Sequence, residues 1–196
     1  MRLALDPGHG GESTGAVGNG IVEKDWCLSF CRLVAARISS CELPEIADIL
    51  LTRNSDVDVS LLERGAQTNA WDADLVISVH VNAHPSPSIA GAMAFHWPGN
   101  DRGQAVGGAI MRAVPSPLHR KRNRLFAATD DPAPDDNWLQ RPRNVLAPHN
   151  ATAVLVEAGY LSNEFDSFWL LEPAVQDGLA FAAICGVLEF ARKFDP

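Results

Sequence analysis

The sequence predicts an α/β fold in a single domain, with a twisted, mainly parallel central sheet of about six strands and helices on both faces. Short apolar runs alternate with stretches of helical periodicity along the whole chain. Two runs, residues 74–81 (DLVISVHV) and 152–159 (TAVLVEAG), are almost continuously hydrophobic, as parallel strands buried on both faces are. The 196 residues, 46% of them hydrophobic, suit one globular domain with a substantial core.

The first half of the chain carries clear signals for individual elements. Trp26, Phe30 and Val34 recur at helical spacing and predict a helix. Ser60 and Glu63 form a capping box, a hydroxyl followed three residues later by a carboxylate, which predicts the start of another. The expected elements are, in order, a strand over residues 2–5, a helix over about 23–38, a strand near 49–53, a helix from 60 to about 70, and a strand over 74–81.

The second half continues this alternation with one interruption. Residues 115–148 contain six prolines and many charges, and we interpret them as a surface excursion and not as a second domain. Around them we expect a strand within 91–97, a helix over 101–114 that its glycines weaken, a strand over 152–159, and two closing helices, the last over about 173–193 with a favourable first-turn proline.

The charge balance argues against nucleic acid as a partner. The chain has 16 Lys and Arg against 24 Asp and Glu, a formal net charge of −8, whereas a nucleic-acid surface needs a basic patch. One basic run, HRKRNR (119–124), is followed by the acidic DDPAPDD (130–136). We interpret the two runs as a solvated loop whose opposite charges offset each other.

Neither the cysteines nor the N-terminus indicates an oxidising compartment or a membrane. Cys27, Cys31, Cys41 and Cys185 form no CxxC pair. A metal role for Cys27 and Cys31 is conceivable, but buried thiols that act as small hydrophobes fit better. We expect no transmembrane segment, because no apolar run reaches the length of a membrane span. The N-terminal segment has one arginine and a very short apolar stretch, so we expect no signal peptide.

Residues 3–11 (LALDPGHGG) predict a strand that ends in a glycine-rich loop, where α/β proteins bind ligands. His9 in this loop could face a phosphate, bind a metal, or only pack. The chain contains neither a GxxxxGK[ST] nor a GxGxxG pattern, so metal binding is favoured over nucleotide binding.

Three predicted strands end in a group that can bind a metal or transfer a proton: His9, His80 and Glu157. Glu23 begins the first helix, and the loop before it is long enough to return it to the same sheet edge. Two imidazoles and one carboxylate are the ligand set of catalytic zinc, which leaves a coordination position for water. His9, Glu23 and His80 suit that role. Glu157 suits a general acid/base that takes the proton of this water and passes it to a leaving amine.

A structural role stays open for each of these residues. A single histidine at a strand end is more often packed or capping than a ligand. Glu157 is harder to explain in this way, because it follows four apolar residues and a buried lone carboxylate is costly. It could instead accept a hydrogen bond from a ligating histidine. The other histidines receive no chemical role, although His84 is the nearest substitute; they are His84, His96, His119 and His149.

Four segments together resemble the zinc-dependent N-acetylmuramoyl-L-alanine amidases of the type-3 amidase family, which include cell-wall and phage endolysin amidases. These are LDPGHGG, Glu23, the stretch TRNSDVDVSLLERGAQTNAWDADLVISVHVNA, and VLVEAGYLSN. The resemblance runs from Leu3 to about Phe190, with residues 115–148 not aligned. It implies zinc held by His9, Glu23 and His80, with Glu157 as the catalytic carboxylate. It also implies cleavage of the peptidoglycan amide that joins N-acetylmuramic acid to L-alanine of the stem peptide.

Two other functions stay open, a zinc exopeptidase that acts on free peptides and a catalytically inactive wall-binding module. We expect residues 1–196 to form one catalytic domain without a separate wall-binding domain. We also expect synthesis in the cytoplasm and action on the cell wall, by phage-type release or after trimming of a leader. The sequence does not predict the oligomeric state.

Overall fold

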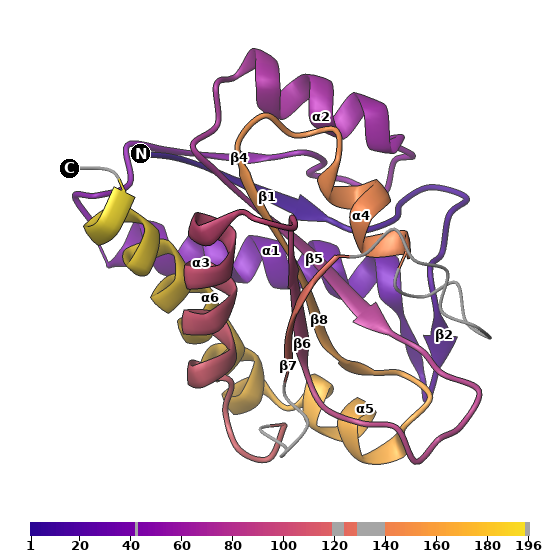
Figure 1. Cartoon of the computed structure of the whole chain (residues 1–196). Helices are drawn as coiled ribbons and strands as arrows, with labels where there is room; N and C mark the ends of the chain where they lie inside the picture. The colour runs from indigo at the N-terminus through magenta and orange to yellow at the C-terminus, as the bar shows by residue number, and fades with distance from the viewer. Residues whose placement is uncertain (42, 119–123, 129–139, 195–196) are drawn as a thin grey trace.

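A six-stranded sheet forms the centre of the computed structural model, which describes residues 1–41, 43–118, 124–128 and 140–194 (Figure 1). The strand order is β4-β1-β5-β8-β6-β7, in which β6 runs antiparallel to β8 and all other neighbours are parallel. The strands are β1 (Arg2–Pro7), β4 (Asp48–Leu51), β5 (Leu75–Asn82), β6 (Met93–His96), β7 (Arg124–Ala127) and β8 (Thr152–Tyr160). The predicted α/β class and mainly parallel sheet are therefore confirmed.

The helices form two groups on the sheet. One group is α1 (Glu23–Ser40), α3 (Asp101–Ala113) and α6 (Pro173–Phe194), in which α6 packs on both α1 and α3. The other group is α2 (Leu61–Ala70) and α4 (Gln140–Leu146), which lie together apart from the first (Figure 1). A short α5 (Glu164–Leu171) joins β8 to α6. The capping box opens α2 as predicted: Ser60 Oγ accepts the Glu63 amide at 3.3 Å, and Glu63 Oε2 accepts the Ser60 amide at 2.8 Å.

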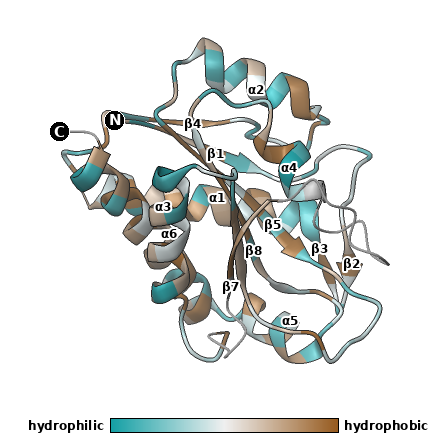
Figure 2. Cartoon of the chain, viewed as in Figure 1, coloured by the Kyte–Doolittle hydropathy of each residue, from teal (hydrophilic) through white to brown (hydrophobic). Residues whose placement is uncertain are grey.

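Successive residues of a strand face opposite sides of the sheet, and here the two sides differ in character. Leu75, Ile77 and Val79 of β5 join the larger apolar core with α1, α3 and α6. Val76 joins a smaller core with residues of β6, β8 and α4. Figure 2 shows the hydrophobic residues concentrated on the central strands. Ser78 and His80 share the side of Val76, so the polar positions of β5 face α2 and α4.

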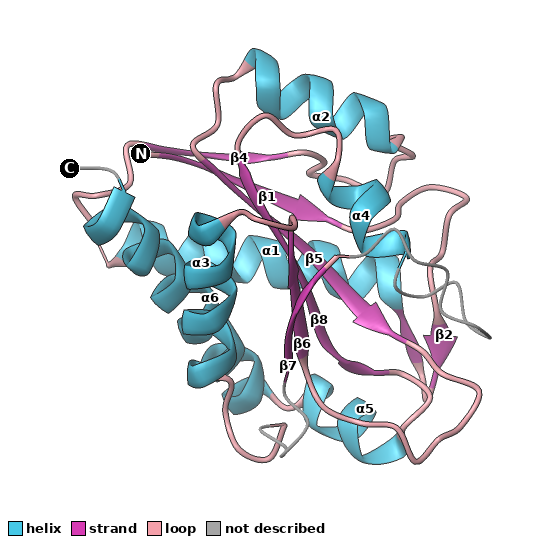
Figure 3. Ribbon diagram, viewed as in Figure 1, coloured by secondary structure: helices cyan, strands magenta, loops and turns pink. Residues whose placement is uncertain are grey.

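The interpretation of residues 115–148 as a surface excursion is wrong for two segments. Residues 124–127 form β7, which extends the sheet at its edge, and residues 140–146 form α4, whose Val145 and Leu146 are buried (Figure 3). Their prolines and charges hide these elements from a search for apolar periodicity. The basic run 119–124 and the acidic run 130–136 lie outside the described residues, apart from the backbone of residue 124.

Two further elements differ from expectation. A hairpin of β2 (Val17–Gly18) and β3 (Ile21–Val22) interrupts the glycine-rich loop, and its two-residue strands are too short to leave a pattern. The helix α3 forms despite its glycines. A Cβ at Gly107 would lie 2.5 Å from Leu125 Cδ1, so this glycine lets α3 approach the sheet edge.

The last helix and two of the four cysteines belong to the larger apolar core. By length and composition α6 could cross a membrane, contrary to the expectation that no run is long enough. It also packs on α1 and α3, and 56% of its apolar window is buried, as in a core helix. Cys27 and Cys31 are fully buried on α1, which confirms their interpretation as small hydrophobic residues.

Candidate active site

The structure brings His9, Glu23 and His80 together at the carboxyl edge of the sheet. Their potential ligand atoms all lie within 4.8 Å of one another. Glu23 Oε1 is 3.2 Å from His9 Nε2 and 3.0 Å from His80 Nδ1, so one carboxylate oxygen faces one nitrogen of each ring. The two rings are nearly perpendicular, with centroids 5.1 Å apart. Three residues that are 14 and 57 positions apart in sequence thus form one cluster.

Two glycines leave the space that these side chains occupy. A Cβ at Gly8 would lie 2.4 Å from His80 Cε1. A Cβ at Gly15, whose φ is +67°, would lie 2.5 Å from Glu23 Oε2 and 2.6 Å from His9 Cδ2. Any side chain at either position would displace a member of the cluster. Gly8 and Gly15 therefore make room for the cluster of three residues.

Glu23 is held as a buried carboxylate at the start of α1. Its Oε2 accepts the Ala16 amide at 2.7 Å, and its Oε1 accepts the Val81 amide at 3.1 Å. Burial alone would raise the pKa of Glu23, but the hydrogen bonds and positive charge of His80 and His9 hold that pKa well below its usual value. Glu23 is therefore ionised at neutral pH and offers an anionic oxygen to a cation.

Glu157 lies on β8 directly opposite His80 in the β5–β8 register. Glu157 is half-buried, in agreement with the expectation of partial burial. Together with His9, Glu23 and His80 it lines one cavity of about 670 Å³. All four site residues predicted from the sequence therefore line the same cavity.

Several further parts of the chain line the rest of the cavity. Ser60 and Leu61 contribute the start of α2, while Val145 contributes α4. Phe95 and Leu155, paired on β6 and β8, form an apolar wall beside Glu157. A volume of this size is in the range of small-molecule sites.

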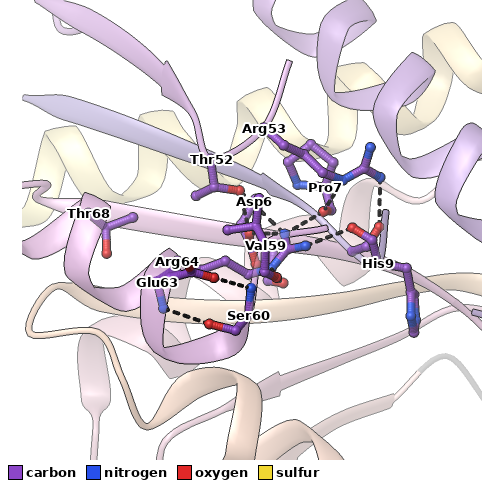
Figure 4. Close-up of polar contacts among 12 residues, drawn as sticks. Asp6, Pro7, His9, Thr52, Arg53, Val59, Ser60, Glu63, Arg64 and Thr68 are labelled. Carbon is purple, nitrogen blue, oxygen red and sulfur yellow. Dashed lines mark hydrogen bonds and ion pairs between the residues drawn. The ribbon is translucent and has the colours of Figure 1, made fainter. Parts of the chain in front are cut away.

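A buried polar network that no sequence pattern indicated lies beneath the glycine-rich loop (Figure 4). Asp6 and Arg64 form an ion pair with Arg64 Nη1 2.6 Å from Asp6 Oδ1, and both side chains are almost fully buried. Thr52 and Ser78 donate further hydrogen bonds to Asp6 at 2.5 and 2.7 Å. Burial would raise the pKa of Asp6, but the charge of Arg64 and these hydrogen bonds hold it below its usual value. The one signal in the sequence is Asp6 itself, a carboxylate at the end of an apolar strand.

A second arginine also reaches the loop. Arg53 donates to the carbonyl oxygens of Pro7 at 3.1 Å and Gly8 at 2.8 Å, and to that of Lys24 at 2.7 Å. Figure 4 shows Arg53 and Arg64 converging on the backbone between Pro7 and His9. The backbone that carries His9 is thus bonded to side chains from two other segments.

Three of the remaining histidines make hydrogen bonds away from the cluster. His84 Nδ1 accepts the Ser86 amide at 2.9 Å, and His96 Nδ1 lies 2.9 Å from the Trp97 carbonyl oxygen. His149 Nδ1 is 2.8 Å from Thr68 Oγ1, which joins α2 to the segment before β8. His119 lies outside the described residues.

Comparisons with known proteins agree over the whole chain. The family model described as N-acetylmuramoyl-L-alanine amidase matches residues 3–189. A germination-specific N-acetylmuramoyl-L-alanine amidase of Bacillus subtilis is 31% identical over 212 residues, covering 99% of this chain and 81% of that protein. An endolysin of Bacillus phage SPP1 is 47% identical over 81 residues, which are 41% of this chain and 29% of that protein.

The fold matches as well as the sequence. The crystal structure of an N-acetylmuramoyl-L-alanine amidase from Clostridium difficile 630 has a TM-score of 0.82 over 98% of this chain and 97% of that chain, at 24% identity. The family match spans nearly every described element, from β1 to α6. The chain therefore belongs to the N-acetylmuramoyl-L-alanine amidase family, a family of hydrolases.

Proposed function

We propose that this chain is a zinc-dependent peptidoglycan amidase that cleaves the amide between N-acetylmuramic acid and L-alanine of the stem peptide. His9, Glu23 and His80 hold the zinc ion, and Glu157 is the general acid/base. The observation that carries the proposal is the placement of three ligand atoms within 4.8 Å of one another, with Glu157 on the wall of the same cavity. The family match supports the substrate.

The donor set fits zinc. Two imidazole nitrogens and one carboxylate oxygen are ligands that catalytic zinc accepts, with further coordination open to solvent or substrate. The buried, ionised Glu23 supplies a negative charge, and Gly8 and Gly15 keep the space around the ligands clear. When bound in such a site, zinc polarises a carbonyl group and lowers the pKa of water.

Glu157 moves the protons that hydrolysis requires. In this reaction a C–O bond forms from water to the lactyl carbonyl carbon, and the C–N bond to L-alanine breaks. The Glu157 carboxylate accepts a proton from the attacking water and then donates one to the departing nitrogen, which is too basic to leave as an anion. Its place opposite His80 sets the carboxylate beside the metal ligands, while Phe95 and Leu155 form an apolar wall next to it.

Mass spectrometry of the muropeptides released from purified cell wall tests the proposal. The zinc-loaded protein should release stem peptides with a free N-terminal L-alanine and leave the glycan strands uncut. A parallel digestion of short free peptides tests the exopeptidase alternative. Cleavage of free peptides but not of cell wall would contradict the proposal in favour of an exopeptidase. No cleavage of either substrate would favour a wall-binding module.

A further inference from the structure

Arg64 makes an unusually complete set of hydrogen bonds for a side chain of a surface-facing helix. From α2 it reaches under the glycine loop, and its side chain is only 4% exposed. Its Nε donates to the Val59 carbonyl oxygen at 2.9 Å, and its Nη1 donates to Asp6 Oδ1 and to the Pro7 carbonyl oxygen, both at 2.6 Å. Its Nη2 donates to the carbonyl oxygen of His9 at 2.7 Å. The guanidinium is thus committed to the protein and is not a free cation for substrate.

The bond to His9 falls on a strained residue. His9 has a φ of +59°, in the left-handed region that a residue with a Cβ seldom adopts. Such a conformation persists when the surrounding structure fixes it. Two contacts do so here: Arg64 Nη2 bonds the His9 carbonyl oxygen, and Ser13 Oγ lies 3.0 Å from His9 Nδ1. With the backbone and Nδ1 both held, Nε2 of the ring is left facing Glu23 at 3.2 Å.

Arg64 is itself anchored to the sheet through Asp6. Asp6 is the penultimate residue of β1, and its carboxylate also accepts hydrogen bonds from Thr52, just after β4, and from Ser78 on β5. The position of Arg64 is therefore fixed by three adjacent strands of the sheet. The Arg64 guanidinium in turn connects these strands to the carbonyl oxygen of His9 in the glycine-rich loop.

We propose that Arg64 is a positioning residue that holds His9 in its left-handed conformation and so sets the affinity of the site for zinc. This inference rests on the proposed function only in taking His9 as a zinc ligand. Arg53 provides a matched comparison, because it is also buried and also bonds the loop. Its acceptors are the carbonyl oxygens of Pro7, Gly8, Lys24 and Ser55, and none of these bonds reaches His9.

The test compares Arg64→Lys with Arg53→Lys in the full chain. Lysine keeps the positive charge beside Asp6 but lacks the planar fork that reaches Asp6 and two carbonyls together. Zinc affinity is measured by competition with a chromophoric chelator. Outer contacts of metal ligands are typically worth about 10–100-fold in metal affinity, and we expect a loss in that range for Arg64→Lys. Arg53→Lys should cause a much smaller loss.

A second readout needs no metal. In the metal-free protein labelled with ¹⁵N-histidine, NMR reports the tautomer and order of the His9 ring. We expect one set of sharp His9 ring signals, from a single ordered ring, in the wild type and in Arg53→Lys, and shifted or broadened signals in Arg64→Lys. If Arg64 only stabilised the fold, as Arg53 does, both variants would have a lower unfolding midpoint, and the His9 signals would not change selectively in Arg64→Lys.

Each outcome decides the proposal. If the wild type does not bind zinc, the proposed function fails at its metal site. If the wild type binds zinc and Arg64→Lys binds it equally well, or if both variants lose affinity equally, positioning by Arg64 is wrong. Trimethylamine N-oxide, which strengthens burial, is added to all samples if a variant is marginally folded. An Arg64→Lys variant that stays unfolded even then would make Arg64 a folding residue and overturn the proposal.

Discussion

The two faces of the sheet differ in what their side chains do, although the same strands form both. On the face covered by α1, α3 and α6, β5 presents Leu75, Ile77 and Val79 to a continuous apolar core. On the face toward α2 and α4, the alternate positions Ser78 and His80 join a polar network and the candidate active site. The apolar face gains stability from burial, which is non-directional, whereas the polar face depends on the placement of individual atoms. Substitutions on the two faces should therefore fail in different ways.

The largest effect is expected from His80→Ala. It removes one of three proposed protein ligands, and metal sites lose affinity severely when a ligand is lost. We expect zinc to be absent after dialysis against a mild chelator, activity at background, and a circular dichroism spectrum like that of the wild type. Elemental analysis of the dialysed protein is the measurement. The same result is expected for His9→Ala, and full zinc occupancy in either variant would contradict the assignment.

Glu157→Gln should lower the catalytic rate without affecting zinc binding, although Glu157 lies on the same face of the sheet as the proposed ligands. Glutamine keeps the shape of the side chain but cannot transfer protons, and general acid–base catalysis is worth about 10²–10⁴-fold in rate. We expect kcat to fall by about a hundredfold or more with zinc content and unfolding midpoint unchanged. Steady-state kinetics on cell wall, with zinc measured on the same samples, provides the test.

Glu23→Gln is the control for that experiment. Because Glu23 is proposed as a ligand, the zinc affinity and the activity of the Glu23→Gln variant should fall together. If Glu157→Gln lost zinc while Glu23→Gln kept it, the two roles would be reversed. A Glu157→Gln enzyme within a few-fold of the wild type would leave Glu157 a structural partner of a histidine.

Ile110→Val should show the opposite behaviour on the apolar face. Ile110 lies on α3 with 2% of its surface exposed, and its Cδ1 is close to Gly186 of α6, where an added Cβ would lie 2.9 Å away. Deleting this methyl group opens a gap between the two helices, and such changes cost about 0.5–1.5 kcal/mol. We expect that loss in the free energy of unfolding, measured in urea, and no change in zinc affinity. A weaker zinc affinity would show that the two faces are coupled.

The sequence predicted best where pattern and topology act together. His80 and Glu157 stand out because each is polar at the end of an apolar strand, and the carboxyl ends of parallel strands meet at one edge. This places both residues, with His9, on one cavity, as the structure confirms. The start of α2 was equally predictable, because its capping box is a local interaction of Ser60 and Glu63.

The polar support of the site could not be found in this way. Arg64 lies on an amphipathic helix among polar residues, where an arginine is usually exposed, and its partner Asp6 is 58 positions away. Only the three-dimensional arrangement shows that the two are buried together. The segments β7 and α4 were not predicted for a related reason. Their sequences have no clear periodicity, and contacts with β6 and β8 stabilise them instead.

The smallest effect is expected at an ion pair that resembles Asp6–Arg64 in chemistry but not in surroundings. Arg37 Nη2 lies 2.5 Å from Asp177 Oδ1, where α1 meets α6, and the two side chains are 50% and 47% exposed. The Asp6–Arg64 distance is 2.6 Å, with side chains 1% and 4% exposed. Removing one partner of a buried pair costs about 3–5 kcal/mol, because the other charge stays buried alone. Exposed pairs are worth only about 0.2–1 kcal/mol.

Asp177→Ala should therefore lower the free energy of unfolding by no more than about 1 kcal/mol, because water solvates the freed Arg37 guanidinium. Raising the salt concentration should reduce even this difference, since screening acts on exposed charges. Urea unfolding of wild type and variant at low and high salt measures both effects, and zinc affinity should stay unchanged. A larger loss that salt does not reduce would mean that Asp177 holds α1 against α6, and stability on the apolar face would then depend on a directed polar contact as the active-site face does.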